Sequence, residues 1–129
     1  PLPWPQPDEF PGSICWCGRK GCIETWVSGP ALAAEHLRRT DETRSVEDIM
    51  AAANAGDVRA LETCKRHADR LARGLALVTN IFDPEMIVLG GDLSNLPHLY
   101  EDLPDLMAPH IFADSPVVSI CPPKWGDAS

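Results

Sequence analysis

The sequence has few basic residues and no long apolar run. Its 129 residues include 11 Lys and Arg against 19 Asp and Glu, which gives a formal net charge of −8. This acidic balance argues against a nucleic-acid binder, because no basic patch could offset the repulsion of phosphates. No run of 18 or more apolar residues is present, so we expect no membrane span. The composition fits one soluble globular domain.

An initial methionine and a signal peptide are also lacking. The chain begins at Pro1, and no charged segment followed by an apolar one is found. We therefore expect a processed product or a piece of a longer protein. Proline is abundant, with 13 residues crowded at the two ends. Residues 1–14 are predicted to be an extended or looped lead-in, because proline removes backbone donors and fixes φ. Trp4 and Phe10 indicate that this lead-in packs against something.

The cysteines do not form an even set. There are five, and Cys15, Cys17 and Cys22 lie within eight positions. A secreted disulfide scaffold would spread an even number along a short chain. Cys15 and Cys17 are also poorly placed to bridge each other. Reduced thiolates around a soft metal fit better, and this predicts a cytoplasmic protein.

A zinc site is one interpretation of this cluster. Three thiolates on a loop bent by Gly18 and Gly21 can occupy three corners of a tetrahedron, as zinc prefers. Free thiols, or an oxidised pair in a mobile loop, are the alternatives. The fourth ligand stays open, because His36 lies in a predicted helix and is expected to face solvent or the core. Cys64 and Cys121 are expected to be core residues.

Three helices are predicted in the middle of the chain, over residues 30–39, 46–54 and about 58–82. Each follows a residue that can cap its first turn: Ser28, Ser45 and Asp57. In the third helix, apolar residues recur at steps of three and four, which is typical of one buried face. These residues are Val58, Leu61, Cys64, Ala68, Leu71, Leu75, Val78 and Phe82. Gly74 interrupts this helix and indicates that another backbone comes close.

Two short strands follow. Residues 86–89 form an apolar run that predicts a buried, parallel strand, and residues 116–120 predict a second strand. A helix that opens at 95–97, kinked or divided by Pro104, lies between them. The class is therefore helix-rich α/β. Because two short strands make a poor sheet, we expect the missing strands in sequence before Pro1.

Two further positions could bind a ligand. Gly90 and Gly91 follow the first strand directly, where glycines let a phosphate or nucleotide approach the backbone. An ordinary turn is the alternative interpretation. Glu24 follows the cysteine loop and could accept hydrogen bonds from the hydroxyls of a sugar or polyol, although most glutamates are simply solvated.

Together these segments resemble a known family. Residues 15–29 (CWCGRKGCIETWVSG) resemble the zinc-loop signature of the ROK family (repressors, open reading frames and kinases). Residues 83–91 (DPEMIVLGG) resemble its second conserved strand and glycine pair, and residues 126–129 resemble the start of its closing segment. The spacing of these blocks matches too, so the resemblance covers essentially the whole chain. The lead-in and the cysteine loop look most like the bacterial fructokinase (mannofructokinase) branch.

The resemblance implies a fold and an activity. The family is similar to hexokinases and actin, with two RNase H-like α/β lobes and ATP in the cleft. This chain would be part of the C-terminal lobe, with residues 1–27 as lead-in and zinc loop and residues 28–129 as helices plus two strands. The parent protein would use ATP and magnesium to phosphorylate a hexose hydroxyl, with fructose favoured, as a homodimer.

The resemblance also implies site residues. The three loop cysteines would hold a structural zinc, Glu24 would bind sugar hydroxyls, and Gly90 and Gly91 would contact the nucleotide. The fourth zinc ligand, a histidine that also touches the sugar, would lie just before Pro1. The catalytic aspartate and the phosphate loop would lie farther upstream, so we expect no catalytic residue and no kinase activity in this chain alone. Asp92 departs from the small residues common there, so it should point away from the phosphates or lie near the adenosine.

Other interpretations remain open from the sequence. The sugar could be glucose, N-acetylglucosamine or N-acetylmannosamine instead of fructose. A sugar-sensing transcriptional repressor of the same family is a different class, with its DNA-binding segment far upstream. A zinc-stabilised interaction module is the third, and it predicts a fourth ligand within the chain, such as His36.

Overall fold

The fold is known from a computed structural model, which describes residues 1–112 and 118–124. The helices are α1 (Glu24–Val27), α2 (Gly29–Thr40), α3 (Val46–Asn54), α4 (Val58–Phe82) and α5 (Pro97–Met107). The strands are β1 (Met86–Val88) and β2 (Ser119–Cys121), and the 3₁₀ helices are η1 (Pro7–Glu9), η2 (Gly91–Asn95) and η3 (Ala108–His110). The family-like residues 126–129, and residues 116 and 117 of the second predicted strand, lie outside the described residues.

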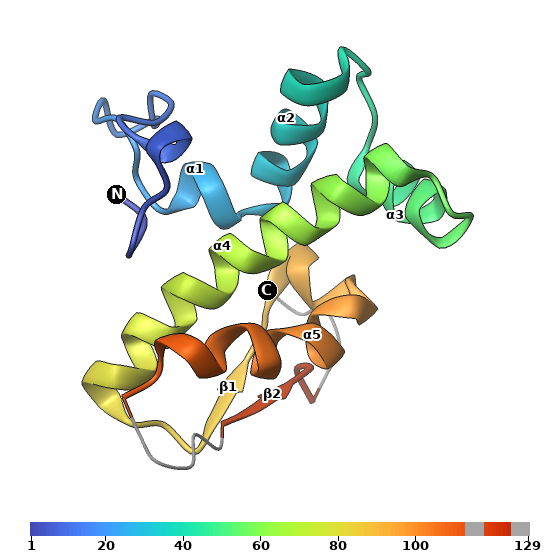
Figure 1. Cartoon of the computed structure of the whole chain (residues 1–129). Helices are drawn as coiled ribbons and strands as arrows, with labels where there is room; N and C mark the ends of the chain where they lie inside the picture. The colour runs from blue at the N-terminus through green and yellow to red at the C-terminus, as the bar shows by residue number, and fades with distance from the viewer. Residues whose placement is uncertain (113–117, 125–129) are drawn as a thin grey trace.

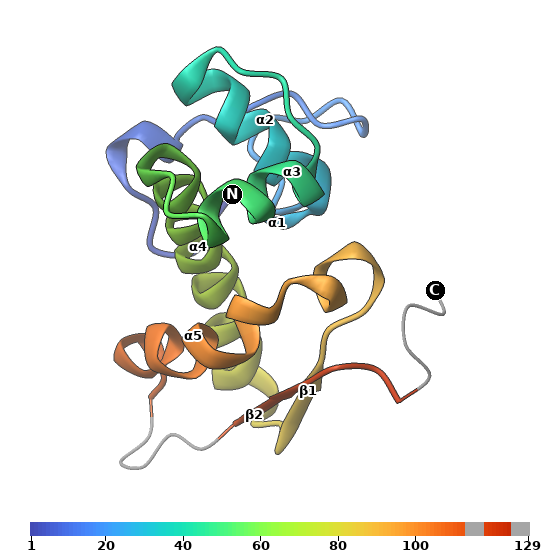
Figure 2. The ribbon, with the colours of Figure 1, turned by 90° about the vertical axis from the view of Figure 1, so that its right-hand side faces the viewer.

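Helix α4 is the central element (Figure 1). Helices α1, α2, α3 and α5 all pack against α4, and α5 also contacts β2 (Figures 1 and 2). The core lies between these elements and includes fully buried residues from four helices: Leu32, Ile49, Ala60, Leu99, Leu103 and Met107. None of the helices in the described ranges is long and apolar enough to cross a membrane.

The predicted helix starts are confirmed. The Ser28 hydroxyl accepts a hydrogen bond from the backbone N–H of Ala31 at 3.2 Å, and the Ser45 hydroxyl accepts one from Asp48 at 3.1 Å. The Asp57 carboxylate accepts from the N–H groups of the second and third residues of α4. Each cap satisfies donors that have no partner within the helix, so the capping residue decides where the helix begins.

The predicted buried face of α4 is confirmed only in its middle. Cys64, Ala68 and Leu71 are buried, but Val58 and Phe82 are 77% and 75% exposed. The reason is length, because α4 has 25 residues whereas α2, α3 and α5 have 12, 9 and 11. At about 1.5 Å per residue, the shorter helices cannot cover its whole face.

The explanation offered for Gly74 is wrong in one respect. A side chain faces this glycine, not another backbone. A Cβ atom at Gly74 would lie 2.8 Å from the Cδ1 atom of Ile23, the residue just before α1. The missing side chain therefore lets the end of the cysteine loop lie directly on α4.

The two strands pair in parallel, as predicted for the first of them, with Ile87 opposite Ile120. The prediction that the first strand is buried is wrong, because Met86 and Val88 are 56% and 55% exposed. Successive strand residues point to opposite faces. Only the face of Ile87 packs against the core, so its two neighbours face outward from this two-stranded sheet.

The lead-in is looped, apart from η1, and lies against α4. Leu2 and Glu9 are its buried residues, with 2% and 3% of their surface exposed. Trp4 stacks on His110, with 4.9 Å between the ring centroids. The expectation that the lead-in packs against another part of the chain is confirmed, but Phe10, which is 68% exposed, does not contribute to it. An aliphatic side chain and a carboxylate therefore anchor the segment beside Trp4.

Candidate functional site

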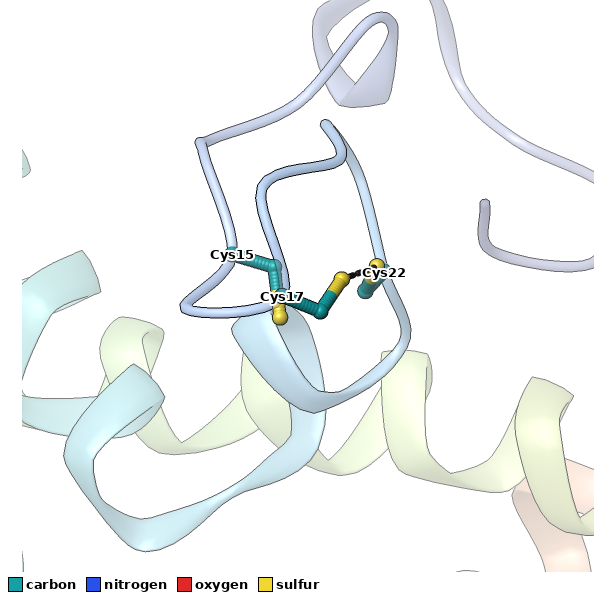
Figure 3. A group of neighbouring side chains, drawn as sticks. All are labelled: Cys15, Cys17 and Cys22. Atoms are coloured by element: carbon teal, nitrogen blue, oxygen red, sulfur yellow. Dashed lines mark hydrogen bonds between the residues drawn. The ribbon is translucent and has the colours of Figure 1, made fainter.

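The cysteine loop brings three thiols together. Cys15, Cys17 and Cys22 turn toward one another (Figure 3), and their sulfur atoms all lie within 4.8 Å of each other. The Sγ atoms of Cys17 and Cys22 are 3.5 Å apart. Backbone hydrogen bonds shape the loop, from Cys15 N–H to the Arg19 carbonyl (2.7 Å) and from Gly18 N–H to the Cys15 carbonyl (2.9 Å). The predicted clustering is confirmed.

Electrostatics within the loop favour a bound cation. A backbone hydrogen bond at Arg19, followed by the neighbouring thiols, holds the pKa of Cys17 below its ordinary value. The hydrogen bond that Cys22 shares with Cys17 raises the pKa of Cys22 to about 11. Cys17 and Cys22 therefore cannot both ionise easily on their own. A divalent metal ion removes this conflict, because coordinated thiols lose their protons.

The donor set fits zinc, since three thiols at this separation match three ligands of a closed sulfur-rich site. Within the described part of the chain, no fourth Cys, His, Asp or Glu joins the group. His36 is fully buried elsewhere, with Nδ1 2.9 Å from the Thr63 hydroxyl and Nε2 3.4 Å from the Glu42 carboxylate. The structure therefore places His36 in the core and gives no support to an interaction module that uses it as a ligand.

The remaining cysteines lie apart from the loop. Cys64 is buried against Met50, with 3.6 Å between the two sulfur atoms, and burial raises the pKa of its thiol. Cys121 ends β2 and is partly buried. Cys64 is therefore a core residue, as predicted, whereas the prediction is wrong for Cys121, which neither belongs to the core nor is among the apolar residues that pack against it.

Gly21 is the most constrained position of the loop. It has φ +72°, and a Cβ atom there would lie 2.3 Å from the backbone oxygen of Pro11. Gly18 has a similar φ of +90°, but a Cβ atom there would meet nothing within 4 Å. The two glycines therefore share the left-handed conformation and differ in the space around them.

We expect Gly21→Ala to disrupt the loop more than Gly18→Ala. Both changes cost about 1–2 kcal/mol for the left-handed conformation, and only Gly21→Ala adds a clash with backbone. Zinc affinity measured by competition with a chelator should fall more than tenfold for Gly21→Ala and less than tenfold for Gly18→Ala. Equal losses in the two variants would contradict this explanation.

Glu24 follows the last of the three cysteines, Cys22, by two positions. It is the first residue of α1 and is exposed. The Thr25 hydroxyl donates a hydrogen bond to the Cys22 carbonyl at 2.7 Å, and Trp26 is buried beneath the same turn. The short helix and the cysteine loop therefore form one unit, and a metal that orders the loop also fixes the Glu24 carboxylate.

The glycine pair lies at the carboxyl end of β1, as predicted. A Cβ atom at Gly90 or Gly91 would meet nothing within 4 Å, so the backbone is open to a ligand. The element that follows is η2, and α5 then begins at Pro97, which confirms the helix predicted to open at 95–97. The Ser94 hydroxyl donates to the Gly91 carbonyl at 2.7 Å and stabilises this turn.

A cleft of about 480 Å³ lies beside the glycine pair. Its walls come from three separate parts of the chain, including Gly29 at the start of α2, Met50 on α3 and Asp92 on η2. Asp92 packs against Gly29, where a Cβ atom would lie 3.5 Å from the Asp92 Cβ. No local sequence pattern predicts this cleft, because its walls meet only in the folded chain.

Comparison with known proteins gives consistent matches. The model of the ROK family matches residues 5–129. A curated N-acetyl-D-glucosamine kinase from Yersinia enterocolitica is 31% identical over 120 residues, which cover 93% of this chain and 40% of that protein. The chain therefore spans about two fifths of the length of this relative.

Two solved structures are also similar. A ROK hexokinase from Thermus thermophilus matches with a TM-score of 0.73 and 26% identity, over 85% of this chain and 39% of that one. A ROK family transcriptional regulator, a homologue of the E. coli MLC protein, matches with a TM-score of 0.70 and 28% identity, over 88% of this chain and 32% of that one. The same fold therefore occurs in a kinase and in a regulator.

Proposed function

The chain belongs to the ROK family, and from this membership we propose that it is part of an ATP-dependent kinase that phosphorylates a hexose hydroxyl. The fold agrees with the prediction of a helix-rich α/β segment of the actin- and hexokinase-like ATPases, since it matches a ROK hexokinase. The observation that carries the proposal is the cluster of three thiols, which is followed two residues after Cys22 by the exposed Glu24 at the start of α1. In this proposal the thiols form a structural metal site and the Glu24 carboxylate binds sugar hydroxyls.

In this proposal the metal has a structural role. Cys15, Cys17 and Cys22 hold zinc, and when bound it supplies a cross-link that keeps the loop in one conformation. Glu24 then accepts hydrogen bonds from the sugar hydroxyls. Magnesium accompanies ATP, and we assign it no ligand among the described residues. Residues 1–27 form the sugar-side unit of the chain, and residues 28–129 form the remainder of its part of the lobe.

In the same proposal the nucleotide binds at the glycine pair. Gly90 and Gly91 leave room for phosphates to approach the backbone, and the adjoining cleft of about 480 Å³ is large enough for a nucleoside. The Asp92 carboxylate would repel phosphates. Its place on the wall of the cleft supports a position beside the adenosine, where a carboxylate can accept hydrogen bonds from ribose hydroxyls.

The identity of the sugar rests on two observations that differ. The lead-in and the cysteine loop resemble the fructokinase branch, and we propose fructose on this ground. The curated relative named above is an N-acetyl-D-glucosamine kinase, which makes N-acetylglucosamine the competing substrate. We also propose that the protein is cytoplasmic and forms a homodimer. The dimer is supported by apolar residues at the end of α4, such as Ile81 and Phe82, which remain 65% and 75% exposed.

A sugar-sensing repressor is the second candidate function. The similarity to a ROK transcriptional regulator favours it, because this part of the fold is shared by both classes. A repressor needs the sugar site and a DNA-binding segment, whereas a kinase also needs phosphoryl transfer. The two candidates therefore differ in what the full-length protein does with ATP.

The test is ATP-dependent phosphorylation by the full-length protein. Fructose, N-acetylglucosamine, glucose and N-acetylmannosamine are compared with magnesium and ATP present, and we expect the highest kcat/KM with fructose. The 129-residue chain alone should give no turnover, because we assign the catalytic aspartate to a segment before Pro1. Turnover by this chain would contradict that assignment. Absence of phosphorylation, together with sugar-dependent DNA binding, would support the repressor instead.

A further inference from the structure

The lead-in has little backbone structure to hold it in place. Four of its first seven residues are prolines, which carry no N–H group and cannot join a sheet. Its position is therefore set by side chains from elsewhere. Those side chains come from α4, more than 60 positions later in the sequence.

Glu9 is the contact point on the lead-in. Only 3% of it is exposed, and each carboxylate oxygen accepts two hydrogen bonds. Oε1 accepts from the Gln6 N–H (2.8 Å) and from Arg73 Nη1 (2.7 Å), and Oε2 accepts from Arg70 Nε and Arg73 Nη2, both at 2.7 Å. Burial alone would raise the pKa of Glu9, but the hydrogen bonds outweigh it and hold the pKa at about 2. Glu9 is therefore an ionised, fully paired group in the interior.

Arg73 extends this contact to the backbone of the lead-in. Its Nη1 atom donates to the carbonyl oxygens of Trp4 (3.1 Å) and Pro3 (3.4 Å). Trp4 has φ +47°, a left-handed conformation that a bulky side chain rarely adopts. Such a conformation persists only when its surroundings fix it, and here the guanidinium and the ring of His110 do so.

Arg70 connects the two chain segments that enter and leave the cysteine loop. On the entering side it donates to Glu9. On the leaving side its guanidinium carbon lies 4.5 Å from the centroid of the Trp26 ring, in a cation–π contact. Its Nη1 atom also lies 3.3 Å from the Glu35 carboxylate on α2. One buried cation thus holds both ends of residues 10–25.

From these contacts we propose that Glu9, Arg70 and Arg73, named here the loop-base cluster, are positioning residues for the sugar side of the site. They close the base of the cysteine loop against α4 and so fix where the Glu24 carboxylate lies. The cluster touches neither the metal ligands nor the glycine pair. This inference rests on the proposed function, because it assigns the sugar contact to Glu24.

The first test is Glu9→Gln in the full-length protein. The amide cannot accept the charge-assisted hydrogen bonds of both arginines, so the loop base opens and Glu24 shifts. We expect the sugar KM to rise about 10–100-fold, as for displacements of about 1 Å in a site. The KM for ATP and the zinc content should stay unchanged. A parallel rise in the KM for ATP, or an unchanged sugar KM, would overturn the proposal.

A matched control breaks another Arg–Glu pair on α4. Arg59 pairs with Glu42, far from the loop, and Arg59→Gln removes that pair. We expect its sugar KM to stay within twofold of the unmodified protein. If Arg59→Gln raises the sugar KM as much as Glu9→Gln does, the effect is general loosening of α4, and the positioning role is wrong.

A second variant guards against misfolding. Glu9→Gln leaves buried guanidinium groups without their anion, which destabilises a fold. The double variant Glu9→Gln/Arg73→Met removes the carboxylate together with the arginine that binds it in a bidentate manner, while Arg70 retains its ion pair with Glu35. We expect this variant to fold and still to show the raised sugar KM. A folded double variant with the unmodified KM would overturn the proposal.

Hydrogen–deuterium exchange tests the cluster without any assay of activity. The amides of Gly18 and Gly21 donate hydrogen bonds within the cysteine loop. Their exchange should be faster in Glu9→Gln than in Arg59→Gln, and equal exchange would overturn the loop-base cluster. If exchange is faster in Glu9→Gln but the unmodified protein phosphorylates no sugar, the proposed function is wrong and the structural role of the loop-base cluster stands.

Discussion

Replacing Cys17 with serine is expected to remove zinc from the full-length protein and to raise its sugar KM at least tenfold. Cys17 supplies one of three thiols that lie within 4.8 Å of one another, and its lowered pKa favours the thiolate form that binds zinc. Even residues that only support a metal ligand are worth about 10–100-fold in metal affinity, so loss of a direct ligand should exceed 100-fold. Zinc per chain, measured by elemental analysis after dialysis against a chelator, checks this.

The matched control for this variant is Cys64→Ser. Cys64 is buried beside Met50 and lies outside the group of three thiols. We expect Cys64→Ser to keep one zinc per chain, whereas Cys17→Ser keeps none. Unchanged zinc content in Cys17→Ser would refute the zinc site. Loss of zinc with an unchanged sugar KM would keep the site but refute its role in placing Glu24.

Replacing Glu24 with glutamine should weaken sugar binding and leave the metal untouched. A hydrogen bond to a charged group is worth about 1.5–3 kcal/mol, and 1.4 kcal/mol corresponds to a factor of ten. We therefore expect kcat/KM for the sugar to fall about 10–100-fold, while the KM for ATP and the zinc content stay constant. Steady-state kinetics with each substrate varied in turn, together with elemental analysis, separate these effects.

Glu101→Gln is the matched control, because Glu101 is an exposed glutamate on α5, away from the loop. It makes the same chemical change, and we expect no kinetic effect from it. A fall in kcat/KM below twofold for Glu24→Gln would remove Glu24 from the sugar site. The zinc loop would then have to support the sugar through another group.

The helices and the cysteine loop were predictable because their causes are local. Ser28, Ser45 and Asp57 each cap a helix that begins at the next residue, and the apolar spacing marks the middle of α4. The loop needs left-handed residues between its cysteines, and Gly18 and Gly21 provide them. In such cases a few neighbouring residues determine the structure.

Features that depend on distant segments were not predictable from the sequence. Arg70 and Arg73 would ordinarily be placed on a solvated face, yet each is buried because Glu9 folds back onto them. Their spacing on one helix face was visible, but no local pattern links them to a carboxylate about 60 residues earlier. The cleft beside Gly91 was missed for the same reason.

The exposed residues of β1 show a different limit of prediction from the sequence. The run from Met86 to Leu89 has the composition of a buried strand, yet Met86 and Val88 face outward. Composition records what a strand packs against in the whole protein, and this chain spans about two fifths of the relative it matches. The composition of the run therefore does not predict which faces of β1 are covered within the described residues.

The separation of Glu9 from Arg73 also has a consequence for the order of events during synthesis. The two residues are 64 positions apart, and a ribosome adds about 5–20 residues per second. Glu9 is therefore synthesised about 3–13 s before Arg73, and the cysteine loop is also synthesised before the α4 residues that close its base. During those seconds no residue of α4 is available to contact the cysteine loop. Metal binding by the three thiols and docking of α4 are therefore two separate steps in the nascent chain.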